Sequence, residues 1–218
     1  MPPKKGTSNR RGRARREEIL DAATELFAAR GYRGAGMLEL AQRVGMSHVG
    51  ILHHFGTKEN LLRAVVARRD EAHDELMADF QEGGFDAFML SYAMGTASFL
   101  EPEVLTRLGT VLRAENLTAD DPLHDYFDSR TQQVRTFLAD EIRTRQQSGE
   151  FRSDVDPDAK AVEILAFSIG LETQWLLNKD AIDVERVFAS FARTLLDDLT
   201  TVDAPRNGVD VPARRNRH

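Results

Sequence analysis

In this 218-residue chain, the residues best suited to binding a partner surround a four-residue turn at positions 45–48. It joins two short stretches, 37–44 and 48–55, whose apolar residues recur at helical spacing. Gly45 lets the backbone reverse tightly, and the Ser47 hydroxyl can cap the second stretch. Outward side chains near the start of such a helix can enter the major groove of DNA. The pattern therefore predicts a helix-turn-helix whose second helix reads DNA.

The second helix must also pack on its neighbours, because that packing fixes its angle of entry into a groove. From the spacing of the apolar residues we expect Val49, Leu52 and Phe55 to form its inner face. His54 is expected to be partly packed. The outer face, free to meet base edges or phosphates, is then expected to carry His48, Gly50 and His53.

Two longer helices are expected to hold this pair in place. The apolar side chains of residues 19–27 recur at helical spacing and predict a helix that Gly31 ends. Thr57 is expected to cap a fourth helix that runs to about Gln81. Lys58 lies in its first turn, where backbone N–H groups and the helix dipole favour a phosphate.

The charge of the chain is unevenly distributed. The formal net charge is −6, which taken alone argues against a nucleic-acid partner. Residues 1–55, however, hold ten Lys/Arg against five Asp/Glu, whereas residues 56–203 hold fifteen against twenty-nine. Positive charge gathered at one end can meet phosphates by releasing counterions. A solvated basic tail on an acidic enzyme is the alternative interpretation of the same charges.

The composition excludes several classes of protein and site. The chain has no cysteine, which rules out disulfides, thiolate nucleophiles and zinc–cysteine sites. No apolar run reaches the roughly 18–20 residues of a membrane-spanning helix. No apolar stretch follows the basic N-terminus to make a signal peptide. We therefore expect a cytoplasmic protein with no membrane partner.

Long helical stretches without strand-like alternation fill the rest of the chain, which predicts an all-α fold. Asp121 and Asp156 precede prolines and are expected to be helix N-caps. Residues 1–13 are basic and poor in apolar side chains, and are expected to form a flexible arm. Residues 204–218 are expected to be a disordered basic tail. Further helices are predicted at 85–100, 102–116, 121–147, 157–178 and 182–201.

Other clusters of polar residues lack the spacing of a catalytic or metal site. His48, His53 and His54 have no cysteine or carboxylate nearby at ligand spacing. Residues 154–165 begin like a calcium-binding loop, but the glycine and the closing glutamate of such a loop are replaced by alanine and leucine. No activated nucleophile and no glycine-rich phosphate loop is recognisable. We expect no catalytic site, no metal and no cofactor.

Several short motifs between residues 17 and 66 occur in one order and at one spacing that together are specific, although each alone is common. They are Ile19-Leu20-Asp21-Ala22-Ala23, Leu26-Phe27, Gly31-Tyr32, Ala41, Gly45-Met46-Ser47, His54-Phe55 and Lys58-Glu59.

These motifs resemble the DNA-binding region of the TetR (tetracycline-repressor-type) family. The rest of the chain is similar to that family in length, helicity and order of elements. The resemblance implies a DNA-binding transcriptional regulator, usually a repressor, with an N-terminal three-helix helix-turn-helix domain. It also implies a C-terminal helical domain that binds a small-molecule effector and dimerises.

Two places depart from the family's pattern. The threonine pair that usually precedes the second helix is here Ala35 and Gly36, and the usual tyrosine of the recognition helix is Leu52. A phosphate-contacting hydroxyl is lost at each place, and the basic arm could offset that loss. The residues expected at the DNA are Arg15, Arg16, Gly36, Met37, Ser47, His48, Val49, Gly50, Leu52, His53, His54 and Lys58.

The resemblance implies further partners: double-stranded DNA with a palindromic operator, a largely apolar effector and a second copy of the chain. The predicted helices 157–178 and 182–201 are apolar on several sides, as expected of helices packed on both a core and a second copy. One larger core is the alternative. The candidate effector-binding residues, which plain core packing would also explain, are Phe99, Leu112, Asn116, Tyr126, Gln174 and Trp175.

These expectations divide the chain into four parts. A sequence-tolerant architectural DNA-binding protein is the alternative function, because a long basic arm would also suit DNA of any sequence. A helical enzyme or metabolite-binding protein is a third, which no catalytic constellation favours. The predicted parts are a flexible arm at 1–13, a helix-turn-helix DNA-binding domain at 14–56, an effector-binding and dimerisation domain at 57–203, and a tail at 204–218.

Overall fold

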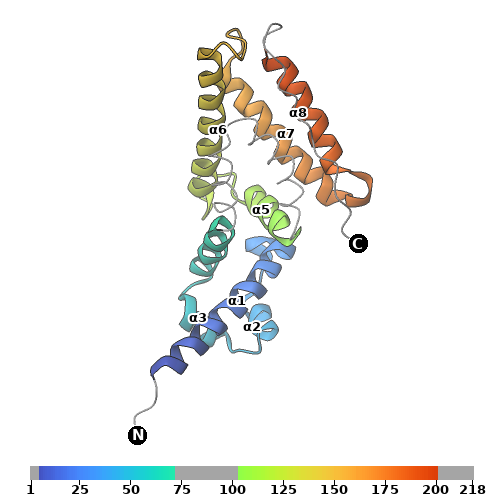
Figure 1. Cartoon of the computed structure of the whole chain (residues 1–218). Coiled ribbons are helices and arrows are strands. Elements are labelled where there is room, and N and C mark those ends of the chain that lie inside the picture. Colours follow the sequence, from blue (N-terminus) through green and yellow to red (C-terminus); the bar gives the residue numbers. More distant parts are fainter. Residues whose placement is uncertain (1–4, 72–102, 201–218) are drawn as a thin grey trace. The chain divides into compact units, whose positions relative to one another are not determined.

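The structure is all-α, as the sequence predicts (Figure 1). It is a computed structural model that describes residues 5–71 and 103–200, with the side chains of α1 from residue 10 onward. Within these ranges the only β pairing is an isolated bridge between Phe151 and Thr200. None of the helices described is long and apolar enough to cross a membrane. The elements are α1 (Lys5–Gly34), α2 (Met37–Arg43), α3 (His48–Phe55), a helix at 58–71, α5 (Glu103–Glu115), α6 (His124–Gln147), α7 (Pro157–Leu177), the 3₁₀ turn η1 (Lys179–Ala181) and α8 (Val184–Leu199).

Packing divides the described residues into two compact units. The first contains residues 5–71 and 103–125, and the second contains residues 126–200. The first unit therefore holds the helix-turn-helix together with the helix at 58–71 and α5. The predicted functional boundary after residue 56 falls inside this unit, and it stays a prediction. The predicted helix at 85–100 and the predicted tail lie outside the described residues.

The core of the first unit forms where α1, the helix at 58–71 and α5 meet. Arg68 joins two of them, since its guanidinium donates to Asp21 Oδ1 at 2.7 Å and to Thr24 Oγ1 at 2.9 Å. Arg69 joins the third, because its Nε donates to the carbonyl of Leu105 at 3.4 Å. The apolar face predicted for residues 19–27 is buried as expected. The core residues are Ile19, Leu20, Ala23, Leu26 and Phe27 of α1, Leu61, Leu62, Val65 and Val66 of the helix at 58–71, and Leu108 and Leu112 of α5.

Two sequence-based expectations are wrong in this part of the chain. The sequence predicts a flexible arm at 1–13, but α1 begins at Lys5. Adding turns to a helix that is already nucleated and packed costs little, so the lack of apolar side chains did not end it. Asp121 is not an N-cap of α6. Its carboxylate instead accepts from the N–H of Thr118 at 2.9 Å and from its hydroxyl at 2.7 Å.

The second unit has a core of apolar side chains from α6, α7 and α8. Phe167 of α7 stacks on Phe191 of α8 with ring centroids 3.7 Å apart, and Phe188 meets both rings at steep angles. Asp156 caps α7, as predicted, by accepting from the N–H groups of Asp158 and Ala159. Aromatic stacking and burial of this kind stabilise the packing of α7 on α8.

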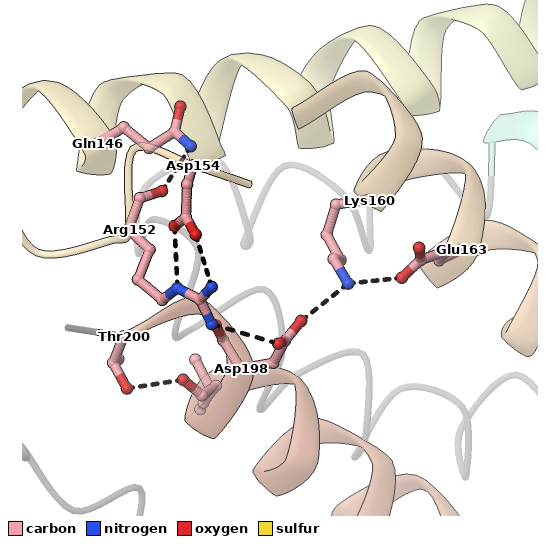
Figure 2. A network of polar contacts seen from close by, with 8 residues as sticks. Gln146, Arg152, Asp154, Lys160, Glu163, Asp198 and Thr200 are labelled. Carbon is pink, nitrogen blue, oxygen red and sulfur yellow. Dashed lines mark hydrogen bonds and ion pairs between the residues drawn. The ribbon is translucent and has the colours of Figure 1, made fainter. Parts of the chain in front are cut away.

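A network of ion pairs joins the loop before α7 to the ends of α7 and α8 (Figure 2). Lys160 Nζ lies 2.9 Å from Asp198 Oδ2 and 2.6 Å from Glu163 Oε2. The guanidinium of Arg152 pairs with Asp154 at 2.8 Å, and the backbone N–H of Arg152 donates to the carbonyl of Leu199 at 2.8 Å. The hydrogen bond from the Lys160 ammonium holds the pKa of Asp198 below its ordinary value, and the positive charge of Lys160 adds to this effect.

Asp198→Asn should therefore lower stability at neutral pH and change how stability responds to acid. A depressed carboxyl pKa stabilises the fold above the unfolded pKa, and that stabilisation is lost as pH falls through the folded pKa. Because solvent screens this exposed group, we expect a loss of about 0.2–1 kcal/mol. The measurement is thermal unfolding of both proteins from pH 7 down to pH 3.

Asp197→Asn is the matched control, because Asp197 forms no ion pair with any residue in the described part of the chain. The difference in unfolding temperature between wild type and Asp198→Asn should shrink toward pH 3. The unfolding temperature of Asp197→Asn should follow that of wild type at every pH. A gap that stays constant with pH would contradict this account.

Candidate DNA-binding site

The turn between α2 and α3 is built by the residues that the sequence indicates. Gly36 is the N-cap of α2, in extended conformation and with no side-chain hydrogen bond, and α2 ends at Arg43. Gly45 then adopts a φ of 61°, a left-handed value that favours glycine. The N–H of Met46 donates back to the carbonyl of Ala41 at 2.9 Å. The left-handed conformation of Gly45 and this hydrogen bond reverse the chain tightly between the two helices.

Local signals also fix both ends of α3. The Ser47 hydroxyl accepts from the N–H of Gly50 at 3.0 Å, which confirms the predicted cap. At the other end Gly56 has a φ of 76°, and its N–H donates to the carbonyl of Leu52 at 2.7 Å. A Cβ at Gly50 would lie 3.1 Å from Met46 Cε and 3.3 Å from Ser47 Oγ. A residue without a side chain at this position therefore leaves room for the cap.

The predicted inner face of α3 is wrong in part. Val49 is 74% exposed, whereas Ile51, which the prediction passed over, is fully buried. Phe55 is buried as expected, and Leu52 is half-buried. Residues four apart lie on one side of a helix, so Ile51 and Phe55 form the inner face together. Val49 stands about 200° around the helix from Ile51 and must then face outward.

The histidines lie largely as predicted. His53 is exposed, and His54 is half-buried with its ring 6.4 Å from the ring of Phe55. His48 is half-buried at the first turn of α3. Among the residues that the structure describes, no three histidines, cysteines or carboxylates are placed to hold a metal ion.

Two arginines of α1 are predicted to contact DNA, and one of them contacts α3 directly. The guanidinium of Arg16 lies 5.0 Å from the ring centroid of Phe55, a cation–π contact that links α1 to the end of α3. Arg15 instead pairs with Glu18 one turn along α1. Arg16 thus lies beside α3, and each arginine has a carboxylate neighbour, since Arg16 also lies 3.9 Å from Glu17.

Lys58 does not extend freely into solvent. Its ammonium lies 4.6 Å from the ring centroid of Tyr32. Burial lowers the pKa of Lys58, and the nearby charge of Glu115 opposes that change. The Thr57 cap that places it is confirmed, because the Thr57 hydroxyl accepts from the N–H of Asn60 at 3.0 Å. A phosphate contact by Lys58 stays a prediction.

Sequence reasoning missed a carboxylate clamp that connects α1 to α5. Glu115, at the end of α5, accepts from the N–H of Tyr32 at 2.6 Å and from that of Arg33 at 3.3 Å. Arg33 also pairs with Asp121 at 2.5 Å. The clamp forms at Gly31, which breaks the helix with a φ of 69° and a ψ of 174°. No local signal could have revealed it, because Gly31 and Glu115 are far apart in the chain.

The predicted effector residues fall in both units. Leu112 and Asn116 belong to the first unit, Tyr126, Gln174 and Trp175 to the second, and Phe99 lies outside the described residues. The effector-binding role of this set stays a prediction.

Within that set, the buried Asn116 has a structural role of its own. Its amide donates to the carbonyl of Leu112 at 2.7 Å and accepts from the N–H of Leu123 at 2.8 Å. Thr110 is a candidate that the prediction missed. Its hydroxyl is the one buried side-chain polar atom without a hydrogen-bond partner in the part of the chain described.

The predicted DNA-contacting residues of α2, α3 and the turn, by contrast, come together in one small unit. They share two short helices and the four residues between them, with Arg16 packed alongside. These residues are Gly36, Met37, Ser47, His48, Val49, Gly50, Leu52, His53 and His54.

Comparisons with known proteins agree with this arrangement. Residues 19–65 match the family profile described as "Bacterial regulatory proteins, tetR family". Residues 112–201 match the one described as "BetI-type transcriptional repressor, C-terminal".

Relatives match over most of their length. The HTH-type transcriptional repressor AcnR of Corynebacterium diphtheriae is 32% identical over 178 residues, which cover 79% of this chain and 87% of AcnR. The HTH-type transcriptional repressor KstR2 of Rhodococcus jostii is 25% identical over 205 residues, covering 92% and 97%. The solved SmeT–triclosan complex superposes with a TM-score of 0.72 at 19% identity and covers 94% of this chain and 100% of that chain. At that identity the last likeness shows the fold alone.

Gly31→Ala should destabilise the protein by roughly 1–3 kcal/mol, because the backbone there has a φ and ψ that are nearly restricted to glycine. An alanine Cβ would also lie 2.3 Å from Glu115 Oε1. Thermal unfolding followed by circular dichroism measures the loss. The double variant Gly31→Ala/Glu115→Ala should not regain wild-type stability, because the backbone strain remains and the hydrogen bonds from Tyr32 and Arg33 to Glu115 are lost.

Gly34→Ala provides the control three residues later. Its added Cβ would make an ordinary contact of 3.6 Å with Arg30 Cβ, so little change is expected. Equal losses for Gly31→Ala and Gly34→Ala would show that the strained turn does not matter.

Proposed function

This chain belongs to the TetR family of bacterial DNA-binding transcriptional regulators, and we propose that it is a repressor that binds a near-palindromic operator as a homodimer and leaves it when a small-molecule effector binds. It is a regulator and not an enzyme, like the relatives that it matches. Because it acts on DNA, the protein belongs in the cytoplasm.

The geometry of α3 is the observation that carries the DNA half of this proposal. A capped helix of eight residues buries Ile51 and Phe55 and leaves Val49 and His53 exposed on its other side. The residues before position 56 carry an excess of positive charge in an otherwise acidic chain. A rigid helix with a free outer face and local positive charge suits major-groove binding.

Exposed apolar residues on α7 support a homodimer. Val162 is 49% exposed and Leu177 is 82% exposed, although α7 and α8 also supply the buried core of the second unit. Large apolar side chains left in solvent favour association with another surface. To bind a near-palindrome, such a dimer must hold its two recognition helices about one DNA turn apart, ~34–36 Å.

A population shift would release the operator. An effector lowers operator affinity only if it binds the DNA-incompetent state more tightly than the competent one. SmeT, which shares this fold, has been solved in complex with triclosan, and that complex supports an apolar effector class here. Thr110 and the predicted set Phe99, Leu112, Asn116, Tyr126, Gln174 and Trp175 are the residues to test.

Sequence-tolerant DNA binding is the second candidate function. Arg10, Arg11 and Arg13 are exposed along the first turns of α1, where they could contact phosphates of any sequence. The two candidates differ in what a base-facing side chain contributes.

His53→Ala separates them. For specific readout we expect the substitution to weaken binding to a selected operator by about 1–3 kcal/mol and to change binding to random DNA little. Fluorescence anisotropy at two salt concentrations measures both affinities, with the operator obtained by selection from random DNA. Equal losses on both DNAs would indicate a phosphate contact and favour the sequence-tolerant protein.

The effector half has its own test. A library of apolar compounds is screened for those that raise the unfolding temperature, since a ligand that binds the folded state stabilises it. A true effector should lower operator affinity by some factor, and operator DNA should lower effector affinity by the same factor. Stabilising ligands that leave operator affinity unchanged would contradict effector-driven release.

A further inference from the structure

Val49 is the least expected feature of the DNA-facing side of α3. Its side chain is 74% exposed, on the side of α3 away from the buried apolar residues Ile51 and Phe55. A single exposed apolar residue is ordinary on a protein surface. At the second position of a recognition helix it is not, because the N-terminal residues of that helix are those that reach base edges.

The local structure holds Val49 in a defined direction. The Ser47 cap fixes the first turn of α3, and the burial of Ile51 sets the rotation of the helix about its axis. Branching at Cβ restricts the valine side chain to few rotamers. Gly50 follows it and adds no side chain that could keep DNA at a distance. Val49 therefore presents a rigid isopropyl group, and His53 lies one turn along on the same face.

The chemistry of the major groove identifies what such a group can recognise. Of the four bases only thymine presents a methyl group there, at C5, and the other edges present hydrogen-bonding groups. An isopropyl group cannot hydrogen-bond, so against those edges it would desolvate polar atoms without replacing their partners. Against a thymine methyl it would bury apolar surface on both sides.

We propose that Val49 selects a thymine in each operator half-site by contact between its isopropyl group and the thymine C5 methyl. This inference rests on the proposed function, since it names a base that the same site reads. His53, four residues later, meets the neighbouring polar edge or phosphate. DNA is the occupant that the charge favours, because residues 1–55 carry ten Lys/Arg against five Asp/Glu.

Deoxyuridine scanning tests this contact directly. An operator is first selected from random DNA with the full chain, and each thymine is then replaced in turn by deoxyuridine, which lacks only the C5 methyl. One position in each half-site should lose about three- to five-fold in affinity per half-site, the value expected for removing one buried methyl group. The same scan is repeated with Val49→Ala and with Val49→Thr, which keeps the branched shape.

Leu38→Ala is the matched control. Leu38 is 69% exposed, close to Val49 in exposure, but it lies on α2. In a helix-turn-helix, this first helix crosses the DNA backbone and does not enter the groove. The sensitive position should lose its response to deoxyuridine in Val49→Ala and keep it in Leu38→Ala. Val49→Thr should retain part of the response.

Three results would overturn the inference. One is a wild-type scan in which no thymine methyl matters, and another is a sensitive position that responds equally in wild type and Val49→Ala. The third is the absence of any selected operator, which would refute the proposed function itself and this inference with it. The first two leave specific DNA binding intact, so the two failures are distinguishable.

Discussion

The turn at Gly31 is the constraint on which the first unit depends, because three helices meet around it. Its backbone conformation turns the N–H groups of Tyr32 and Arg33 toward the carboxylate of Glu115. A charge-assisted hydrogen bond of this kind is about twice as strong as a neutral one. The clamp fastens α1 to α5, while Lys58 over the Tyr32 ring adds the start of the next helix. In the chain, α2 and α3 lie between the end of α1 and the helix at 58–71, which meet at this junction.

The orientation of α3 follows from a second constraint, the burial of Ile51 and Phe55. A helix of eight residues has few ways to bury two large apolar groups, and this choice leaves Val49 and His53 outward together. Specific reading of DNA needs side chains held in one geometry on a rigid scaffold. Arg16 over the Phe55 ring ties α1 to the same helix. The unit is thus organised to present one face of α3.

Local signals in the sequence predict much of this structure, and long-range contacts account for what they miss. Glycine at a left-handed position and a hydroxyl cap act within a few residues, so the helix-turn-helix and its ends are predictable. The rotation of α3 is not, because apolar residues at positions 49, 51, 52 and 55 suit more than one inner face. The Glu115 clamp and the division into two units depend on residues distant in the chain.

Footprinting of the DNA upstream of this protein's own gene is the most direct test of specific, dimeric DNA binding. It is done with the full chain, against excess random DNA and at two salt concentrations. The account predicts a protected near-palindrome that survives competition, with half-sites about one DNA turn apart. Protection that spreads along the fragment, or that vanishes equally from all DNA as salt rises, would contradict it and leave only electrostatic binding.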